Sequence, residues 1–200
     1  MRALPSTSGD VFERAVGADL DVVASNYIEA AGPCGDGVVF EKLPLNYLYA
    51  GSIHMALPQS KMVVVRRGAV DNCFAMFSTL FGAAYPFSYD LGDLAAYYAA
   101  YDALVSHWTA CLPDQILEVG YEAFVQDPAA TGPVIARHVG LDWQAAMLKI
   151  EDNATSSVTE SAAQIRRPIY QSASGRWRNY ATHLKPLTVM LKAQGISLEP

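Results

Sequence analysis

The sequence predicts an α/β domain built on a parallel sheet, and three observations support this class. Short runs of β-branched residues alternate with stretches of helical periodicity along the 200 residues. The apolar content is 52% and the charged content is 17%, which is typical of a chain that buries a core. The β-rich runs are apolar almost throughout, as in parallel strands covered on both faces. Right-handed crossovers are expected to connect them.

Three runs are predicted to be strands: "GVVFEKL" at 37–43, "KMVVVRR" at 61–67 and "QILEVGY" at 115–121. Each follows a stretch that contains Gly or Pro, the usual punctuation before a strand. A helical stretch, "NYLYAGSIHMAL" at 46–57, separates the first two runs. The alternation of strand and helix favours a parallel arrangement.

The clearest helix is predicted to begin after Asp90, whose carboxylate can cap the first turn. Apolar and aromatic residues then recur at intervals of three and four, which predicts one core-facing stripe. Pro113 is expected to close this unit. The stripe consists of Leu94, Tyr97, Tyr98, Tyr101, Leu104, Val105 and Trp108.

Three more helices are predicted in the C-terminal part. Two of them, at 127–140 and 143–153, are expected to join near Gly140, and the last covers about 184–194. Between them, the polar segment 153–174 lacks clear periodicity.

Composition excludes several classes of function. The net charge of −6 argues against a protein that holds nucleic acid by bulk charge. No apolar stretch reaches about 18 residues, so no segment is expected to cross a membrane. The start, "MRALPSTSGD", lacks the apolar core of a secretory signal. Cys34, Cys73 and Cys111 are widely spaced, which indicates reduced thiols in a cytoplasmic protein.

One turn suggests an anion site. In "VVVRRGAVDNCFAMFS" at 63–78, a strand ends in two arginines and a helix follows at once. Ligands of open α/β sheets bind beyond the carboxyl ends of the strands, where helix amides also favour negative charge. Arg67 could hold a phosphate there with two hydrogen bonds. It could equally pair with a surface carboxylate, and the turn alone leaves both readings open.

Four blocks in order extend this hypothesis. They are "EKLPLNYLYAGSIHMALPQSKMVVVRR", "YPFSYDLGDLAAYYAAYDALVSHW", "LEVGYEAFVQDP" and "SAAQIRRPIYQSASGRWRNY". Over roughly residues 37–187 the chain resembles the bacterial sulfotransferases related to tyrosylprotein sulfotransferase, which are often attached to tetratricopeptide repeats. The resemblance implies a three-layer parallel sheet of the P-loop nucleotide-kinase type. It also implies transfer of a sulfuryl group from 3′-phosphoadenosine 5′-phosphosulfate to a hydroxyl or amine. The expected organisation is a divergent segment at 1–36 and a sulfotransferase-like domain at 37–200.

The resemblance assigns roles to individual residues. Lys42 matches the lysine that contacts the sulfuryl group, and Ser161 matches a serine that orients the phosphosulfate. Arg67 and Arg176 match ligands of the 3′-phosphate, and Tyr121 matches a residue beside the adenine. Such transfer depends mostly on positioning and on neutralising the charge of the leaving oxygen. Arg166 and Arg167 lie in the segment that resembles the loop closing over the nucleotide.

Plainer interpretations remain for each residue. Lys42 could be a solvated lysine at a strand end, and Tyr121 a half-buried tyrosine after a strand. The arginines late in the chain could form a solvated basic loop. Trp177 is expected to anchor the core.

The sequence also departs from the family pattern. The "PRSGTT"-like loop for the 5′-phosphosulfate and the strand before it are not found, and the catalytic base would lie in that region. Glu13 and Glu29 are candidates for the base only by default. The family places a serine eight residues after the arginine, where this chain has Ala75. Gly68 and Ala69 replace the common Asp-Pro.

Losing a central strand would leave backbone groups unpaired. The chain is therefore expected to be a fragment, or a relative in which a partner chain or a second copy completes the sheet. The expected acceptor is a small molecule or a peptide, and no metal is expected. The alternative is a non-catalytic nucleotide-binding or assembly module that keeps the fold. Three findings would end the case for the phosphate site: side chains of Arg67 and Arg176 that lie far apart, the same side chains facing opposite sides of the molecule, or a turn after Val65 already filled by a carboxylate of the protein.

Overall fold

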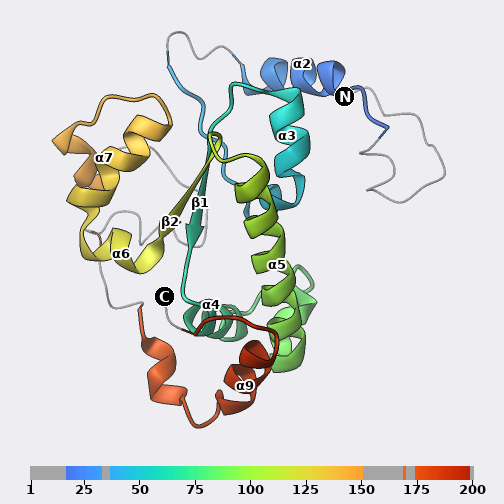
Figure 1. Cartoon of the computed structure of the whole chain (residues 1–200), viewed down its shortest axis with the longest axis vertical. Helices are drawn as coiled ribbons and strands as arrows, with labels where there is room; N and C mark the ends of the chain where they lie inside the picture. Colours follow the sequence, from blue (N-terminus) through green and yellow to red (C-terminus); the bar gives the residue numbers. More distant parts are fainter. Residues whose placement is uncertain (1–16, 33–36, 151–168, 170–173, 199–200) are drawn as a thin grey trace. The chain divides into compact units, whose positions relative to one another are not determined.

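The computed structural model describes residues 17–32, 37–150, 169 and 174–198. The chain divides into two compact units, Met1–Ser60 and Lys61–Pro200 (Figure 1).

The first unit is helical where it is described. Helix α2 (Leu20–Ala31) begins at Asp19, whose carboxylate accepts hydrogen bonds from two first-turn amides. The 3-10 helix η1 (Pro44–Tyr49) leads into α3 (Ala50–Ala56), so the helix predicted at 46–57 begins as a tighter turn. Helices α2 and α3 pack against each other.

The strand predicted at 37–43 is wrong, because these residues form no strand. Val38, Val39 and Phe40 are exposed, and Phe40 is the most exposed of the three, at 70%. A strand is stable only when a neighbour satisfies its backbone groups and covers its side chains. The structure shows no such neighbour for this run among the residues it describes, which is why the apolar pattern was misleading.

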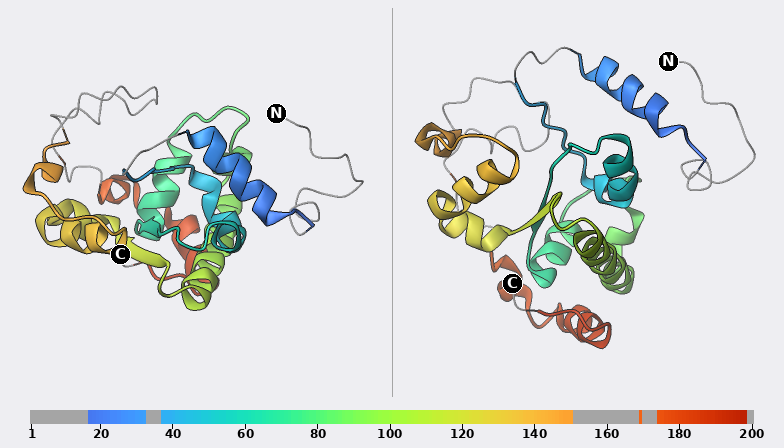
Figure 2. Two further views of the ribbon diagram at one scale, coloured as in Figure 1. Left: turned by 90° about the horizontal axis from the view of Figure 1, so that it is seen from above. Right: turned by 45° about the horizontal axis from the view of Figure 1, so that its top comes forward.

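The second unit contains the parallel sheet. Strand β1 (Met62–Arg66) pairs directly with β2 (Ile116–Gly120), in a register that runs from Met62↔Ile116 to Arg66↔Gly120. Both strands were predicted at these places, and their parallel pairing is confirmed. The connection runs through α4 (Ala69–Phe77) and α5 (Leu91–Cys111), and α6 (Tyr121–Gln126) follows β2. Helix α5 lies on one side of the strands and α6 on the other in each view (Figures 1 and 2).

The sheet is less covered than the sequence predicts. Val65, which belongs to the apolar run of β1, is 52% exposed, and its neighbours Val63 and Val64 are half-buried. In β2, by contrast, Ile116 and Val119 are buried. The backbone groups of the two strands that face each other are nevertheless hydrogen-bonded along the whole pairing.

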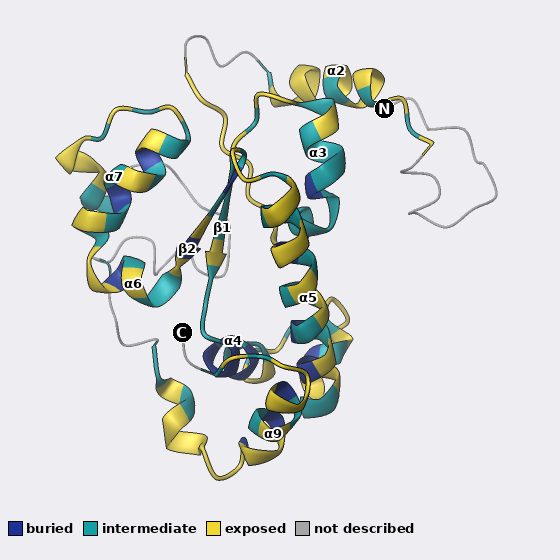
Figure 3. Cartoon of the chain, viewed as in Figure 1, coloured by how far each residue is buried: buried dark blue, intermediate teal, exposed yellow. Residues whose placement is uncertain are grey.

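The core of the second unit lies between α4, α5 and α9 (Lys185–Ala193), where Figure 3 shows the buried positions. The sequence predicted both α5 and the last helix, and both are confirmed. Trp177 packs against this core as predicted, from the short 3-10 helix η5 (Arg176–Tyr180). The buried members are Ala69, Val70, Cys73, Phe74, Leu94, Ala95, Tyr98, Leu184, Leu187 and Leu191.

The cap predicted for α5 is present. The carboxylate of Asp90 accepts hydrogen bonds from the amides of Gly92 at 2.7 Å and Asp93 at 3.0 Å. We expect Asp90→Ala to lower the free energy of unfolding by about 0.5–2 kcal/mol, because those amides lose their acceptor. Chemical denaturation measures this loss. Asp90→Asn keeps an acceptor and should remain close to the wild-type value; an equal loss in both variants would show that the cap is not the cause.

On the other side of the sheet, α7 (Pro128–His138) ends at an imidazole that contacts both strands. His138 Nε2 lies 3.1 Å from the carbonyl oxygens of Met62 and Gln115, at the amino ends of β1 and β2. Gly132 of α7 leaves room for the ring of Trp143, which a β-carbon would overlap. The helix predicted at 143–153 is reduced, in its described part, to the 3-10 turn η3 (Ala145–Leu148). This turn buries no residue, so it lacks the tertiary packing that stabilises most helices in proteins.

Candidate functional site

The carboxyl ends of the two strands bring Arg67 and Tyr121 together. Arg66 pairs with Gly120 in the ladder, so the next residue of each chain segment leaves the sheet at the same edge. The guanidinium carbon of Arg67 lies 5.2 Å from the centre of the Tyr121 ring, within the range of a cation–π contact. The resemblance assigns these two residues to one nucleotide site, and in the structure they are neighbours.

Asp71 joins Arg67 to the segment that carries Arg176. Asp71 Oδ1 lies 3.5 Å from a terminal nitrogen of Arg67, one helical turn along α4. The other oxygen of Asp71 accepts the amide hydrogen of Gly175 at 2.7 Å. Arg176 is exposed and follows Gly175 directly, so the structure places the Arg176 backbone close to the arginine turn. Gly175 has a φ of 75°, where a β-carbon would overlap the Arg178 side chain.

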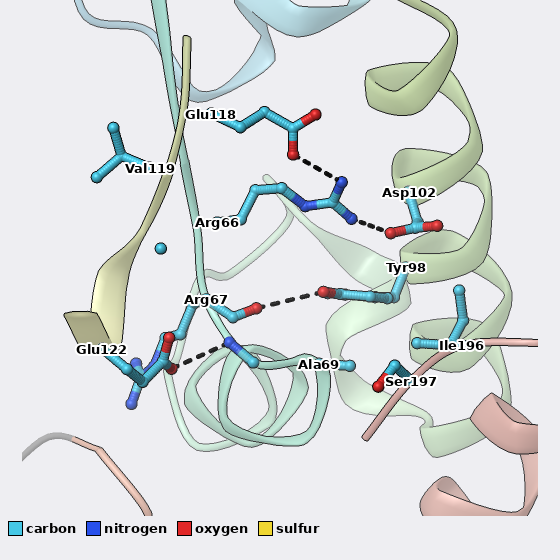
Figure 4. A pocket seen from close by; sticks show the side chains of 12 residues that line it. Arg66, Arg67, Ala69, Tyr98, Asp102, Glu118, Val119, Glu122, Ile196 and Ser197 are labelled. Atoms are coloured by element: carbon cyan, nitrogen blue, oxygen red, sulfur yellow. Dashed lines mark hydrogen bonds and ion pairs between the residues drawn. The ribbon is translucent and has the colours of Figure 1, made fainter. Parts of the chain in front are cut away.

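A carboxylate of the protein lies in the arginine turn. Glu122 Oε1 accepts the amide hydrogen of Gly68 at 3.0 Å, and Tyr98 donates its hydroxyl hydrogen to the carbonyl oxygen of Arg67 at 3.2 Å (Figure 4). Of the findings expected to end the case for a phosphate site, this one is present, and it counts against that hypothesis. It assigns the backbone donor of Gly68 to Glu122, so an anion here depends on the guanidinium of Arg67.

Arg66 serves a structural role. It forms ion pairs with Asp102 of α5 and with Glu118 of β2, the latter at 3.0 Å. Glu118 also accepts the hydroxyl hydrogen of Thr109 at 2.7 Å. Burial alone would lower the pKa of Arg66, but the hydrogen bond and charge of Glu118 raise it above its ordinary value. Arg66 therefore ties α5 to the sheet. The alternative stated for Arg67, an arginine paired with a carboxylate of the protein, also has support, because Arg67 is ion-paired with Asp71, although Asp71 is buried rather than at the surface.

A cavity of about 320 Å³ opens at this edge, at the small end of the range for ligand sites. Two guanidinium groups line it, from Arg66 and Arg67, and three carboxylates do so, from Asp102, Glu118 and Glu122. Two positive and three negative charges leave a balance of −1. The remaining lining residues are Gly68, Ala69, Tyr98, Val119, Gly120, Ile196 and Ser197.

Buried acidic groups beside this cavity predict a loss of stability in alkali. Burial raises the pKa of Tyr98 and of Tyr101, although the charge of Arg66 opposes this, and burial raises the pKa of Cys73 to about 12. A raised folded-state pKa stabilises the fold fully below the unfolded-state value, and this stabilisation disappears as the pH rises through the folded-state value. We therefore expect the free energy of unfolding to fall above about pH 9, where an unfolded cysteine begins to ionise.

Urea denaturation at pH 8 and about pH 10.5 measures this decline. Tyr98→Phe should cost about 1 kcal/mol at pH 8, because its hydroxyl leaves the Arg67 carbonyl, and should make the alkaline decline shallower. A decline of the same size in the variant would show that Tyr98 does not contribute.

The remaining predicted site residues are not tested by this geometry. Lys42 is exposed and belongs to the first unit. Glu29 is exposed on α2. Ser161, Arg166, Arg167 and Glu13 lie outside the described residues. These predictions stay predictions.

Ala75 occupies the position where the family has a serine, and its backbone carbonyl accepts two side-chain hydrogen bonds. The carbonyl oxygen of Ala75 accepts hydroxyl hydrogens from Ser78 at 3.2 Å and Thr79 at 2.7 Å. Ser78 is therefore engaged locally and does not replace the serine that the resemblance expects at position 75.

Sequence reasoning missed Asp71 and Glu122. A signal existed for Asp71, since Arg67 and Asp71 stand four apart at a helix start, where such pairs meet. For Glu122 the only signal in the sequence was its position beside Tyr121, in the first helical turn after a strand. Two thiols, Cys73 and Cys111, are free; Cys34 lies outside the described residues. Within those residues, no group of three or more potential metal ligands is found, and no helix is long and apolar enough to cross a membrane.

Comparison with known proteins places this chain in a family. An uncharacterized protein of Aquifex aeolicus (strain VF5) is 26% identical over 157 residues, which cover 77% of this chain. The chain spans only 21% of the length of that relative. The model of the sulfotransferase family matches residues 9–145. This range contains both strands, β1 and β2, and the arginine turn that connects β1 to α4. The match covers more than half of the chain, and the chain therefore belongs to the sulfotransferase family.

Proposed function

We propose that this chain binds 3′-phosphoadenosine 5′-phosphosulfate and acts in transferring its sulfuryl group to a hydroxyl or amine of a small molecule or peptide. In that reaction the bond between sulfur and the phosphate oxygen breaks, a bond from sulfur to the acceptor forms, and the acceptor loses a proton. The two parallel strands would belong to the three-layer sheet that the resemblance implies.

The observation that carries the proposal is the contact between Arg67 and Tyr121. A half-buried guanidinium, with its side chain 21% exposed, lies against an aromatic ring at the carboxyl edge of a parallel sheet. This edge is where α/β proteins bind nucleotides. The guanidinium suits the 3′-phosphate, and the ring lies where adenine could pack beside it.

The resemblance adds roles for further residues to the proposal. Arg176, one residue beyond the Gly175–Asp71 hydrogen bond, would add a second positive charge for the 3′-phosphate. Lys42 would neutralise charge on the leaving oxygen, and Ser161 would orient the phosphosulfate. Arg166 and Arg167 would close over the nucleotide.

A non-catalytic module is the second candidate, and specific observations favour it. The cavity carries a balance of −1, and Arg66 is bound to two carboxylates. Glu122 holds the amide of Gly68, and Ala75 stands where the family has a phosphate-binding serine. Each feature weakens attraction for a dianion, and the guanidinium of Arg67 is itself ion-paired with Asp71.

Calorimetric titration with 3′,5′-adenosine diphosphate distinguishes the two candidates, with 5′-adenosine monophosphate as the matched ligand. We expect the diphosphate to bind at least about tenfold more tightly, because its 3′-phosphate gains charge-assisted hydrogen bonds. Equal affinities for the two ligands would show that the protein does not bind the 3′-phosphate. No heat with either ligand at about 1 mM, a weak-binding threshold, would favour the non-catalytic module.

A further inference from the structure

The first turn of α4 is capped by a carboxylate from a different element. Gly68 precedes α4, and no side chain of the local sequence caps this helix start. Instead, Glu122, from the first turn of α6, accepts the Gly68 amide hydrogen at 3.0 Å across 54 positions of sequence. A helix start attracts negative charge through its free amides and its dipole. Glu122 therefore supplies the anion that this turn favours.

Two carboxylates lie at the turn, but they differ in freedom. Asp71 has a side chain only 9% exposed; one of its oxygens accepts the amide hydrogen of Gly175 at 2.7 Å, and the other forms an ion pair with Arg67 at 3.5 Å without a hydrogen bond. Glu122 is half-buried, has a longer side chain, and lines the cavity, which Asp71 does not. Of the two, Glu122 is the one whose carboxylate can leave the turn for solvent.

We propose that Glu122 is an internal competitor of the nucleotide, holding the Gly68 amide and opposing the 3′-phosphate until the ligand displaces it. The inference rests on the proposed function, because it concerns the same turn. On binding, a phosphate oxygen takes the amide hydrogen of Gly68 and contacts Arg67, while the Glu122 carboxylate swings into water. The exchange replaces one charge-assisted hydrogen bond by another, so affinity is set partly by the displaced carboxylate.

Neutralising Glu122 tests this competition. Glu122→Gln keeps an amide oxygen that can accept from Gly68 but removes the negative charge. We expect the variant to bind 3′,5′-adenosine diphosphate about three- to tenfold more tightly at low salt, because a like charge a few ångströms away is removed. The gain should shrink at about 0.5 M salt, where charges are screened. Thermal melting confirms that the variant is folded, and Glu122→Ser serves the same purpose if it is not.

Asp114→Asn is the matched control. Asp114 is exposed and precedes β2, at the opposite end of the strand from Gly120. The substitution makes the same change in net charge and should leave the affinity unaltered. If the wild type binds and Glu122→Gln binds equally or more weakly, the competition is refuted while the proposed function stands. If neither protein binds the nucleotide, the proposed function itself fails, and the competition fails with it.

Discussion

Replacing Leu187 by alanine should lower the free energy of unfolding by about 2–5 kcal/mol, the range for fully buried leucines. Leu187 lies on α9 with no exposed surface, in the core formed with α4 and α5. The substitution removes buried apolar atoms and leaves a cavity, which close-packed neighbours fill only in part. Urea denaturation followed by circular dichroism measures the change.

Val189→Ala provides the control on the same helix. Val189 is 58% exposed, so its truncation should change stability by no more than about 0.5 kcal/mol. The comparison matters because α9 lies beyond residue 145, where the match to the family ends. Equal effects of the two substitutions would show that α9 does not belong to the core.

Arg67→Gln should weaken binding of 3′,5′-adenosine diphosphate at least about tenfold, since a hydrogen bond to a charged group contributes roughly 1.5–3 kcal/mol. Glutamine keeps a polar side chain but loses the charge and the second donor. The change also leaves the nearly buried Asp71 without its cation, so a lower melting temperature is expected. Calorimetry below that temperature measures the affinity of folded protein.

Arg137→Gln is the matched control for this loss. Arg137 is exposed in the last turn of α7, and its substitution changes the net charge by the same amount. Its affinity for the nucleotide should equal that of the wild type. An equal loss in both variants would attribute binding to overall charge, and an unaffected Arg67→Gln would remove Arg67 from the site.

Local sequence patterns were sufficient to predict the helices and strands whose apolar residues are buried in the core. The stripe containing Leu94, Tyr98 and Val105 marked α5, and these three positions are buried. The runs of β1 and β2 were recognised because they are apolar and lie between turn residues. The run at 37–43 carries the same pattern, yet it forms no strand, because pairing is a property of two segments rather than one.

The candidate site was predictable only in part. The resemblance placed Arg67 and Tyr121 at one nucleotide, and the register of the two strands makes them neighbours. It could not give the carboxylates around them, because the Gly68–Glu122 and Asp71–Gly175 hydrogen bonds join residues 54 and 104 positions apart. These contacts depend on the tertiary fold, and they decide how much positive charge the turn can offer.

A crystal structure of the chain with 3′,5′-adenosine diphosphate tests the central claim most directly. The account predicts the 3′-phosphate within hydrogen-bond distance of the Arg67 guanidinium, adenine beside Tyr121, and the Glu122 carboxylate away from the Gly68 amide. A nucleotide bound elsewhere, with Glu122 still on that amide and no phosphate near Arg67, would contradict it.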